Sequence, residues 1–222
     1  MTGRRFRHEI YVPPDPAAVN IRRWLGYMKE TTNNIEEKLI ESFKTLVMKE
    51  PVEKITIKEI ADGAGVIRTT FYYHFQDKYE LVERIIHQNL VGPIMDLVNQ
   101  KKVDEALLEI FTRLDEERAF YKRLSKMEGQ NSFKEILDRE ISEGLQEILL
   151  RKGTGEHILR IVDRYPWMTP KFIADYYAQS FTYALITFLH TDPPATPQEA
   201  TEVFDYVVRH SLNEAVWDWY LK

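Results

Sequence analysis

Cysteine is absent from this 222-residue chain. Disulfides, thiolate metal sites and cysteine nucleophiles are therefore excluded, and a reducing compartment is allowed. No apolar run approaches the roughly 20 residues of a membrane-spanning helix, and the N-terminus lacks the apolar core of a signal peptide. We therefore expect a cytoplasmic protein without a membrane partner.

Signatures of catalysis and of metal binding are also missing. The six histidines show neither the HxxxH nor the HxxE spacing of metal ligands. The sequence contains no P-loop, nucleophile elbow or paired-carboxylate motif. We therefore expect no enzyme activity, no cofactor and no bound metal.

The chain is mildly acidic, with the composition of a globular protein. Hydrophobic residues make up 44% and charged residues 29%, which is enough apolar material for a core. The net charge of -5 argues against indiscriminate nucleic-acid binding, which usually requires a basic domain. Charges more than roughly 8 to 10 Å apart are largely screened, so this acidity does not exclude a local basic surface.

The N-terminal segment, residues 1–31, differs from the rest. It is basic and has three closely spaced prolines, so no helix is expected across Pro13 to Pro16. One interpretation is that residues 1–27 precede a natural start at Met28. The alternative is a basic arm that lies along DNA. The cations of this arm would be Arg4, Arg5, Arg7, Arg22 and Arg23.

Helical spacing of apolar residues begins at Ile35. Leu39 and Phe43 continue the same stripe and predict a first helix that ends before Pro51. No alternating strand pattern competes with helical spacing further along the chain. We therefore predict an all-α fold of nine or ten helices.

Capping pairs and a glycine turn divide the next segment into three short helices. Thr56 and Glu59 have capping-box spacing and predict the start of a second helix. A third helix is expected over 67–75, after the glycines of DGAG. Asp77 and Glu80 form another capping pair and open a fourth helix.

This arrangement describes a helix-turn-helix in which 67–75 would be the recognition helix. On a helical wheel Phe71 and Phe75 point to the core. The side chains that point to the opposite side are those of Thr69, Thr70 and Tyr73. Hydroxyls can meet base edges or a thymine methyl, and tyrosine or histidine can reach phosphates. The alternative is a surface helix with an arbitrary polar face.

Two lysines bracket the third helix. Lys78 lies in the first turn of the fourth helix, where the helix dipole favours a phosphate. Lys58 lies on the second helix, on the other side of the turn. We expect both ammonium groups to contact the DNA backbone.

The segment ITIKEIADGAGVIRTTFYYHFQDKYEL closely resembles the DNA-binding signature of the TetR/AcrR family of bacterial transcriptional regulators. The resemblance covers 35–86 and implies base or backbone contacts from the third helix, with phosphate contacts from the two lysines. The implied DNA-binding residues are Lys58, Arg68, Thr69, Thr70, Tyr72, Tyr73, His74 and Lys78. Ile67 departs from the family pattern, which often has a serine or threonine cap there. The missing cap costs on the order of 1 kcal/mol.

We expect three parts: the N-terminal extension (1–31) indicated by composition and, as the resemblance implies, a DNA-binding domain (32–80) and a larger helical domain (81–222) that binds an effector and dimerises. Helical spacing in the larger domain predicts segments over 106–114, 120–127, 133–150, 172–189 and 201–220. Within it, EERAFYKRLSKMEGQNSFKEIL resembles a C-terminal subtype that includes regulators of dihydroxyacetone kinase operons.

The last two helical segments carry apolar stripes that are too wide for burial against one neighbour. We predict a homodimer that uses both segments in a symmetric four-helix interface. The expected interface residues are Phe181, Leu185, Phe188, Val207 and Leu212. The alternative is that both stripes belong to the monomer core. A dimer would place the second recognition helix about 34 to 36 Å away, so the operator should be palindromic.

The middle helices are rich in aromatic residues. Such residues often only fill a core, but in this family the same region holds the effector cavity, and an aromatic lining suits a small apolar or aromatic effector. The candidate pocket residues are Phe111, Phe120, Tyr121, Met127, Phe133, Trp167 and Tyr177.

Two functions remain as hypotheses. The first is a ligand-responsive dimeric transcriptional repressor, whose effector favours a dimer with wrongly spaced recognition helices. The second is a helical adaptor or co-regulator that acts through protein contacts without its own operator, which the acidity and Ile67 favour. Alanine at Thr70 and Tyr73 separates them, because only the repressor would lose operator binding.

Overall fold

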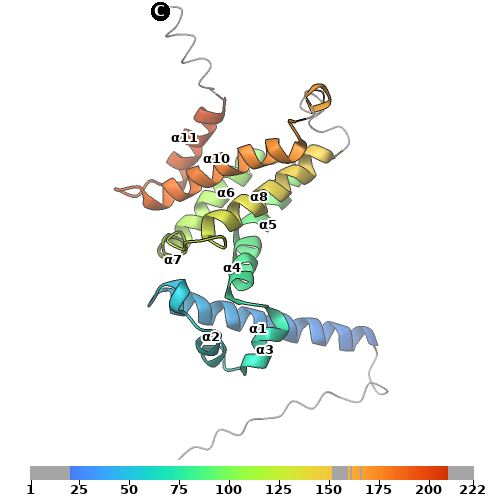
Figure 1. The fold of residues 1–222 in the computed structure, drawn as a ribbon, viewed down its shortest axis with the longest axis vertical. Helices are drawn as coiled ribbons and strands as arrows, with labels where there is room; N and C mark the ends of the chain where they lie inside the picture. The colour runs from blue at the N-terminus through green and yellow to red at the C-terminus, as the bar shows by residue number, and fades with distance from the viewer. Residues whose placement is uncertain (1–20, 152–159, 161, 166, 210–222) are drawn as a thin grey trace, which may run out of the picture.

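The computed structural model describes residues 21–151, 160, 162–165 and 167–209. Among these residues, side chains are described from residue 34 to residue 208. Every regular element among these residues is a helix, so the predicted all-α class is confirmed. The three N-terminal helices form one end of the molecule and α11 (Pro197–Arg209) lies toward the other (Figure 1). None of the helices in these ranges is both long and apolar enough to span a bilayer.

The N-terminal domain contains the predicted helices and one additional turn. Its elements are α1 (Ile21–Val47), the 3-10 turn η1 (Val52–Lys54), α2 (Ile57–Gly63), α3 (Arg68–His74) and α4 (Lys78–Ile86). α1 starts inside the range that we expected to be an extension, because no proline lies between Pro16 and Pro51 to interrupt it. Arg22 and Arg23 therefore belong to α1. The other arm residues, Arg4, Arg5 and Arg7, lie outside the described residues.

Both predicted capping pairs are confirmed. The Thr56 N–H donates to Glu59 Oε2 (2.9 Å), and the Glu59 N–H donates to Thr56 Oγ1 (3.3 Å). Asp77 Oδ1 accepts from the N–H groups of Tyr79 (2.8 Å) and Glu80 (2.9 Å). These bonds satisfy N–H groups that a first helical turn leaves without partners. The starts of α2 and α4 are therefore fixed locally.

Phe71 and Phe75 hold α3 to the domain core, as predicted. The two side chains are buried and their ring centroids lie 5.7 Å apart. They belong to a cluster that includes Leu39 and Phe43 of α1. The same cluster continues through Ile85 of α4 into the C-terminal domain. One continuous apolar core therefore joins the two domains.

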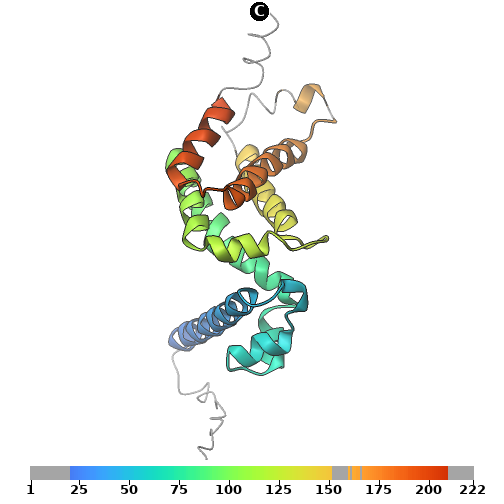
Figure 2. The same ribbon diagram turned by 90° about the vertical axis from the view of Figure 1, so that its left-hand side faces the viewer.

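The C-terminal domain continues directly from α4. Its elements are the π segment η2 (His87–Val91), α5 (Gly92–Asn99), α6 (Val103–Glu116), α7 (Arg118–Leu124), α8 (Phe133–Leu150), α10 (Pro170–His190) and α11. The most extensive contact between described helices is that of α8 with α10, and α10 contributes the small buried side chains of Ala174 and Ala178 to the core. α11 packs against α6 at the far end of the domain (Figure 2).

Polar contacts attach the end of α1 to the C-terminal domain. Lys44 Nζ lies 2.7 and 2.9 Å from the two carboxylate oxygens of Glu117. Arg123 Nη1 donates to the carbonyl oxygen of Val47 (3.2 Å), one of the acceptors that the last turn of α1 leaves free. The N-terminal domain is therefore connected to the C-terminal helices through both α4 and α1.

Candidate nucleic-acid interface

A tight turn directs the chain from α2 into α3. Gly65 has φ of 70°, in the left-handed region that glycine adopts without strain. Gly63 lies so close to α1 that a Cβ at this position would come within 2.3 Å of Ser42 Oγ. That hydroxyl donates to the carbonyl oxygen of Ile60 (2.8 Å). α2 therefore packs closely on α1, which leaves α3 at the edge of the domain.

The outer face of α3 is exposed. Tyr73 is 77% exposed and Tyr72 is 48% exposed. Arg68 and Thr69 are also exposed, whereas Thr70 is half-buried. The side chains that face outward therefore combine one cation, hydroxyls and two aromatic rings, opposite the buried Phe71.

Arg68 is positioned by the next turn of the same helix. Its Nη2 donates to the Tyr72 hydroxyl (3.3 Å), and its guanidinium carbon lies 5.9 Å from the centroid of the Tyr72 ring. A guanidinium has five N–H donors, so this contact leaves most of them for phosphate or guanine. Arg68 is thus a pre-oriented cation at the start of the recognition helix.

Lys58 lies on the surface of α2 and is already paired. Its Nζ is 3.2 Å from Asp62 Oδ2, and both side chains are largely exposed. Exposed pairs of this kind contribute at most about 1 kcal/mol and are screened by salt. A phosphate can therefore replace Asp62 as the partner of Lys58.

His74 does not face outward. Its side chain is only 3% exposed, and Nδ1 lies 3.4 Å from Glu36 Oε1 of α1. Arg84 contacts the other oxygen of the same carboxylate at 3.6 Å. The structure therefore directs His74 toward α1, and its implied DNA contact would require this side chain to turn outward.

Lys78 is also directed inward. Its ammonium donates to the carbonyl oxygens of Val52 (2.7 Å), Glu53 (2.9 Å) and Ile55 (2.9 Å) around η1. Burial lowers the pKa of Lys78, while the nearby carboxylates of Glu53 and Asp77 oppose that shift. An ammonium has three donors, and all three are used here. Lys78 thus joins α4 to the η1 turn, and its expected phosphate contact would require breaking these bonds.

Ile67 precedes α3 without a side-chain cap, as predicted. Sequence reasoning treated this residue only as a poor cap and missed its exposure, which reaches 68%. A helical wheel does not reveal this exposure, because Ile67 has extended backbone angles (φ -86°, ψ 155°). An apolar residue at a position that favours serine or threonine was the signal that could have drawn attention to it.

The seven candidate effector residues fall into a buried group and an exposed group. Tyr121 contacts Phe120 and Phe133, with ring centroids 5.2 and 6.0 Å away, and all three are buried. Burial raises the pKa of the Tyr121 hydroxyl well above its usual range, and a hydrogen bond to Asn89 opposes this. The remaining buried candidates are Phe111 and Met127, whereas Trp167 and Tyr177 are exposed.

The candidate dimer residues are divided as well. Leu185 and Phe188 are buried in the core of one chain, which corrects their assignment to a partner-facing surface. Phe181 is half-buried and packs against Phe204 of α11 in a tilted arrangement, with ring centroids 4.8 Å apart. Val207 is 62% exposed, and Leu212 lies outside the described residues. Amphipathic spacing could not distinguish the two faces of α10, because both are apolar.

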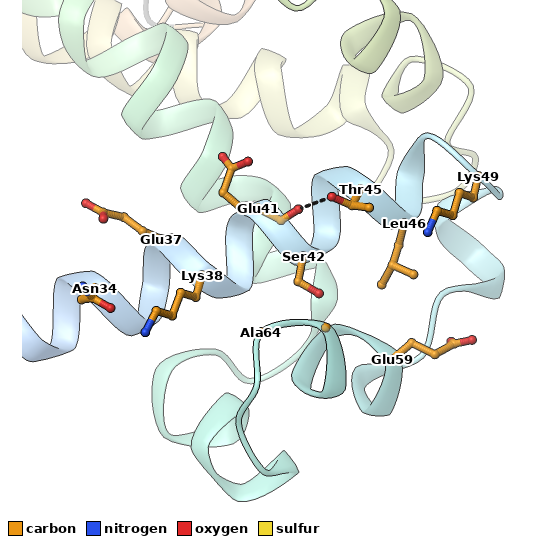
Figure 3. Close-up of a pocket in the computed structure, with 11 residues that line it drawn as sticks. Asn34, Glu37, Lys38, Glu41, Ser42, Thr45, Leu46, Lys49, Glu59 and Ala64 are labelled. Atoms are coloured by element: carbon orange, nitrogen blue, oxygen red, sulfur yellow. Dashed lines mark hydrogen bonds between the residues drawn. The ribbon is translucent and has the colours of Figure 1, made fainter. Parts of the chain in front are cut away.

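A hollow of about 680 Å³ lies between α1 and α2 (Figure 3). Its walls carry both lysines and carboxylates, among them Lys38, Lys49, Glu37 and Glu59. Its lining comes from α1, the residues just after α1, α2 and Ala64, without any residue of α3. It is therefore separate from the outward face of the recognition helix.

Two family models match the chain. The model of bacterial regulatory proteins of the tetR family matches residues 44–85. The model of a transcriptional regulator C-terminal region matches residues 101–210. Together they cover well over half of the sequence and both predicted functional domains.

Curated relatives are more distant. The chain is 23% identical over 180 residues to YxbF of Bacillus subtilis, an HTH-type transcriptional regulator, covering 75% of this chain and 43% of that protein. It is 30% identical over 91 residues to the dhaKLM operon transcriptional activator DhaS of Lactococcus lactis, covering 40% of this chain and 49% of that protein. The chain thus spans less than half of the length of either relative.

Solved structures share the fold. NalD, the secondary repressor of the MexAB-OprM multidrug efflux pump in Pseudomonas aeruginosa, aligns with a TM-score of 0.53 at 18% identity, over 80% of this chain and 96% of that one. The dihydroxyacetone kinase operon activator DhaS aligns with a TM-score of 0.54 at 18% identity, over 79% and 94%. With the matched models and the helix-turn-helix, these similarities show that the chain belongs to the TetR family of bacterial transcriptional regulators, whose members are not enzymes.

Proposed function

We propose that the protein is a dimeric, ligand-responsive repressor that binds a palindromic DNA operator through α3. The outward face of α3 carries this proposal: Arg68, Thr69, Tyr72 and Tyr73 are exposed on a helix that Phe71 anchors. Their side chains supply donors and aromatic rings of the kinds that contact phosphates and base edges. Because Phe71 holds this helix to the core, the backbone that carries these groups is already ordered before DNA binds, which lowers the entropy cost of binding.

Exposed apolar side chains on α10 and α11 support the dimer. Tyr183 is 71% exposed, and Val203, Tyr206 and Val207 are each more than 60% exposed. Val203, Tyr206 and Val207 share one face of α11 by helical spacing, and clusters of exposed apolar side chains commonly mark protein contacts. A second copy that packs on α10 and α11 would cover them and give a four-helix interface.

Binding of an effector among the aromatic residues could reach the DNA-binding domain through Tyr121. This residue contacts Phe120 and Phe133 and is hydrogen-bonded to Asn89, which lies in the π segment directly after α4. An apolar ligand that displaces these rings would shift the end of α4. Because α4 leads from the recognition helix, the spacing between the two half-sites would change and operator affinity would fall.

A repressor needs only to bind the operator and to release it when the effector binds. This requires no surface beyond the DNA and effector sites, which is why we propose repression. The solved relatives include a repressor and an activator, so the direction must be measured. A reporter gene behind the operator should be silent with the protein and active without it. The opposite response would identify an activator.

The test begins with selection of DNA by the full chain. Duplexes with a random central region are selected at about 150 mM salt, where non-specific binding is weak. We expect a palindrome whose half-sites are about one helical turn apart, and a molar mass of two chains. The adaptor alternative predicts that no duplex is enriched.

A further inference from the structure

Among the α-helices described from α2 to α10, α3, α5, α6 and α7 begin without a side-chain cap, and of the four residues at these N-cap positions only that of α3 is apolar and exposed. α2, α4, α8 and α10 begin after Thr56, Asp77, Ser132 and Thr169, and each of these side chains accepts a backbone N–H. At α3 the same position holds Ile67, which provides no cap and leaves an apolar side chain 68% exposed. Local rules are most often broken at functional sites, where the side chain is needed for something else.

The surroundings of Ile67 indicate what it contacts. It is followed by the exposed Arg68, and the exposed Lys58 lies on the preceding helix. An apolar group next to the Arg68 cation suits a surface that is negatively charged and carries isolated apolar groups. The major groove of DNA has this character, because phosphates line it and the C5-methyl groups of thymines project into it.

We propose that Ile67 is a specificity-determining residue that packs against a thymine methyl group in each operator half-site. This inference rests on the proposed operator binding and adds a base preference to it. Arg68 follows directly and is held by Tyr72, so its guanidinium would contact the DNA next to this thymine. The half-site should therefore require a T·A pair at one fixed position.

Uracil tests the contact because it differs from thymine only by lacking the methyl group. In the selected operator, each thymine of a half-site is replaced by uracil in turn, and binding is measured by fluorescence anisotropy. We expect one position at which uracil weakens wild-type binding by about fourfold per half-site, the value for one buried methyl group. For I67S the same replacement should have no effect, as a double-mutant cycle requires for a direct contact.

Stability provides a second measurement. Serine at this position can accept an N–H of α3, so I67S should melt at the wild-type temperature or above it. Its operator affinity should nevertheless fall. A purely structural role for Ile67 would move stability and affinity in the same direction. M48S removes another exposed apolar side chain of the same domain, 42% exposed, and should leave affinity unchanged.

Several results would overturn the proposal. Uracil could be tolerated at every thymine, I67S could bind the operator as tightly as wild type, or I67S could keep the same uracil penalty. In each of these cases the wild-type protein still selects a palindrome, so operator binding survives and only the role of Ile67 fails. If the wild-type protein selects no duplex, both proposals fail together.

Discussion

Two surfaces of the molecule expose tyrosines, and the residues around them differ. On α3, Tyr72 contacts Arg68 and Tyr73 is exposed on the same helix. On α11, Tyr206 lies at helical spacing from the exposed Val203 and Val207, and α10 exposes Tyr183. A tyrosine next to a guanidinium suits a phosphate, whereas a tyrosine among valines suits another apolar surface. The neighbours, rather than the residue type, therefore indicate which contact each surface makes.

The two surfaces also lie toward opposite ends of the molecule (Figure 1). The connections between them are α4 with the π segment after it and the end of α1, where Lys44 contacts Glu117. A substitution on one surface should leave the other intact unless it disturbs these connections. The following predictions use this separation.

The largest effect is expected on the α10–α11 surface. Tyr183→Asp would place an unpaired charge in the proposed dimer interface, which is costly. Light scattering should give the mass of one chain, and operator affinity should fall by roughly a hundredfold because two half-sites no longer bind together. Val103→Asp, at an exposed position of α6, should change neither quantity. A Tyr183→Asp protein that remains dimeric would contradict the assignment of this surface.

The next effect concerns the support of the recognition helix. Lys78→Met leaves three carbonyl oxygens around η1 without their donor, so unfolding free energy should fall by about 1 to 3 kcal/mol. Because Lys78 is directed inward, the salt dependence of operator binding should not change. Lys58→Met should have the opposite pattern: unaltered stability and a salt slope smaller by about 0.9. A reduced salt slope for Lys78→Met would show that Lys78 does contact a phosphate in the complex.

Tyr73→Ala tests the α3 surface itself. Its side chain is 77% exposed, so removal should leave the melting temperature and the dimer mass unchanged. Operator affinity should fall by about tenfold, the order of one lost specific contact. Tyr165→Ala removes a tyrosine that is 43% exposed outside both surfaces and serves as control. Equal affinities for the two variants would show that α3 does not use Tyr73.

The smallest effect is a pH dependence at the end of α10. Burial lowers the pKa of His190, and Lys122 and Lys126 lower it further. A depressed pKa means that the folded state resists protonation of His190. The contribution of this residue to the free energy of unfolding is therefore fully present above the ordinary pKa of about 6.5 and is lost as the pH falls below that value. The melting temperature should therefore fall more on acidification for wild type than for His190→Gln. Equal losses would show that His190 does not contribute.

Features set by neighbours in sequence could be predicted. The caps at Thr56 and Asp77 and the inward direction of Phe71 and Phe75 depend on contacts within one helix or its adjoining turn. Helical spacing and capping rules describe such contacts directly. The fold class and the helix-turn-helix followed from them.

Features set by distant residues could not be predicted in this way. His74 turns inward because Glu36 lies beside it, and Lys78 turns inward because the carbonyls of η1 converge on its ammonium. Leu185 is buried by neighbouring helices although its spacing also suited a dimer face. These partners lie far away in the sequence, and a helical wheel contains no information about them.

The inward direction of Lys78 also bears on how quickly the protein finds its operator. Hydrogen bonds to backbone carbonyls hold the positive charge of Lys78 inward, and Asp62 offsets the charge of Lys58 in the free protein, so Arg68 supplies much of the attraction on the described α3 face. Long-range attraction raises the rate of encounter with DNA, whereas close contacts lengthen the lifetime of the complex. With little steering from this face, selectivity for the operator would depend on slow dissociation from the correct sequence.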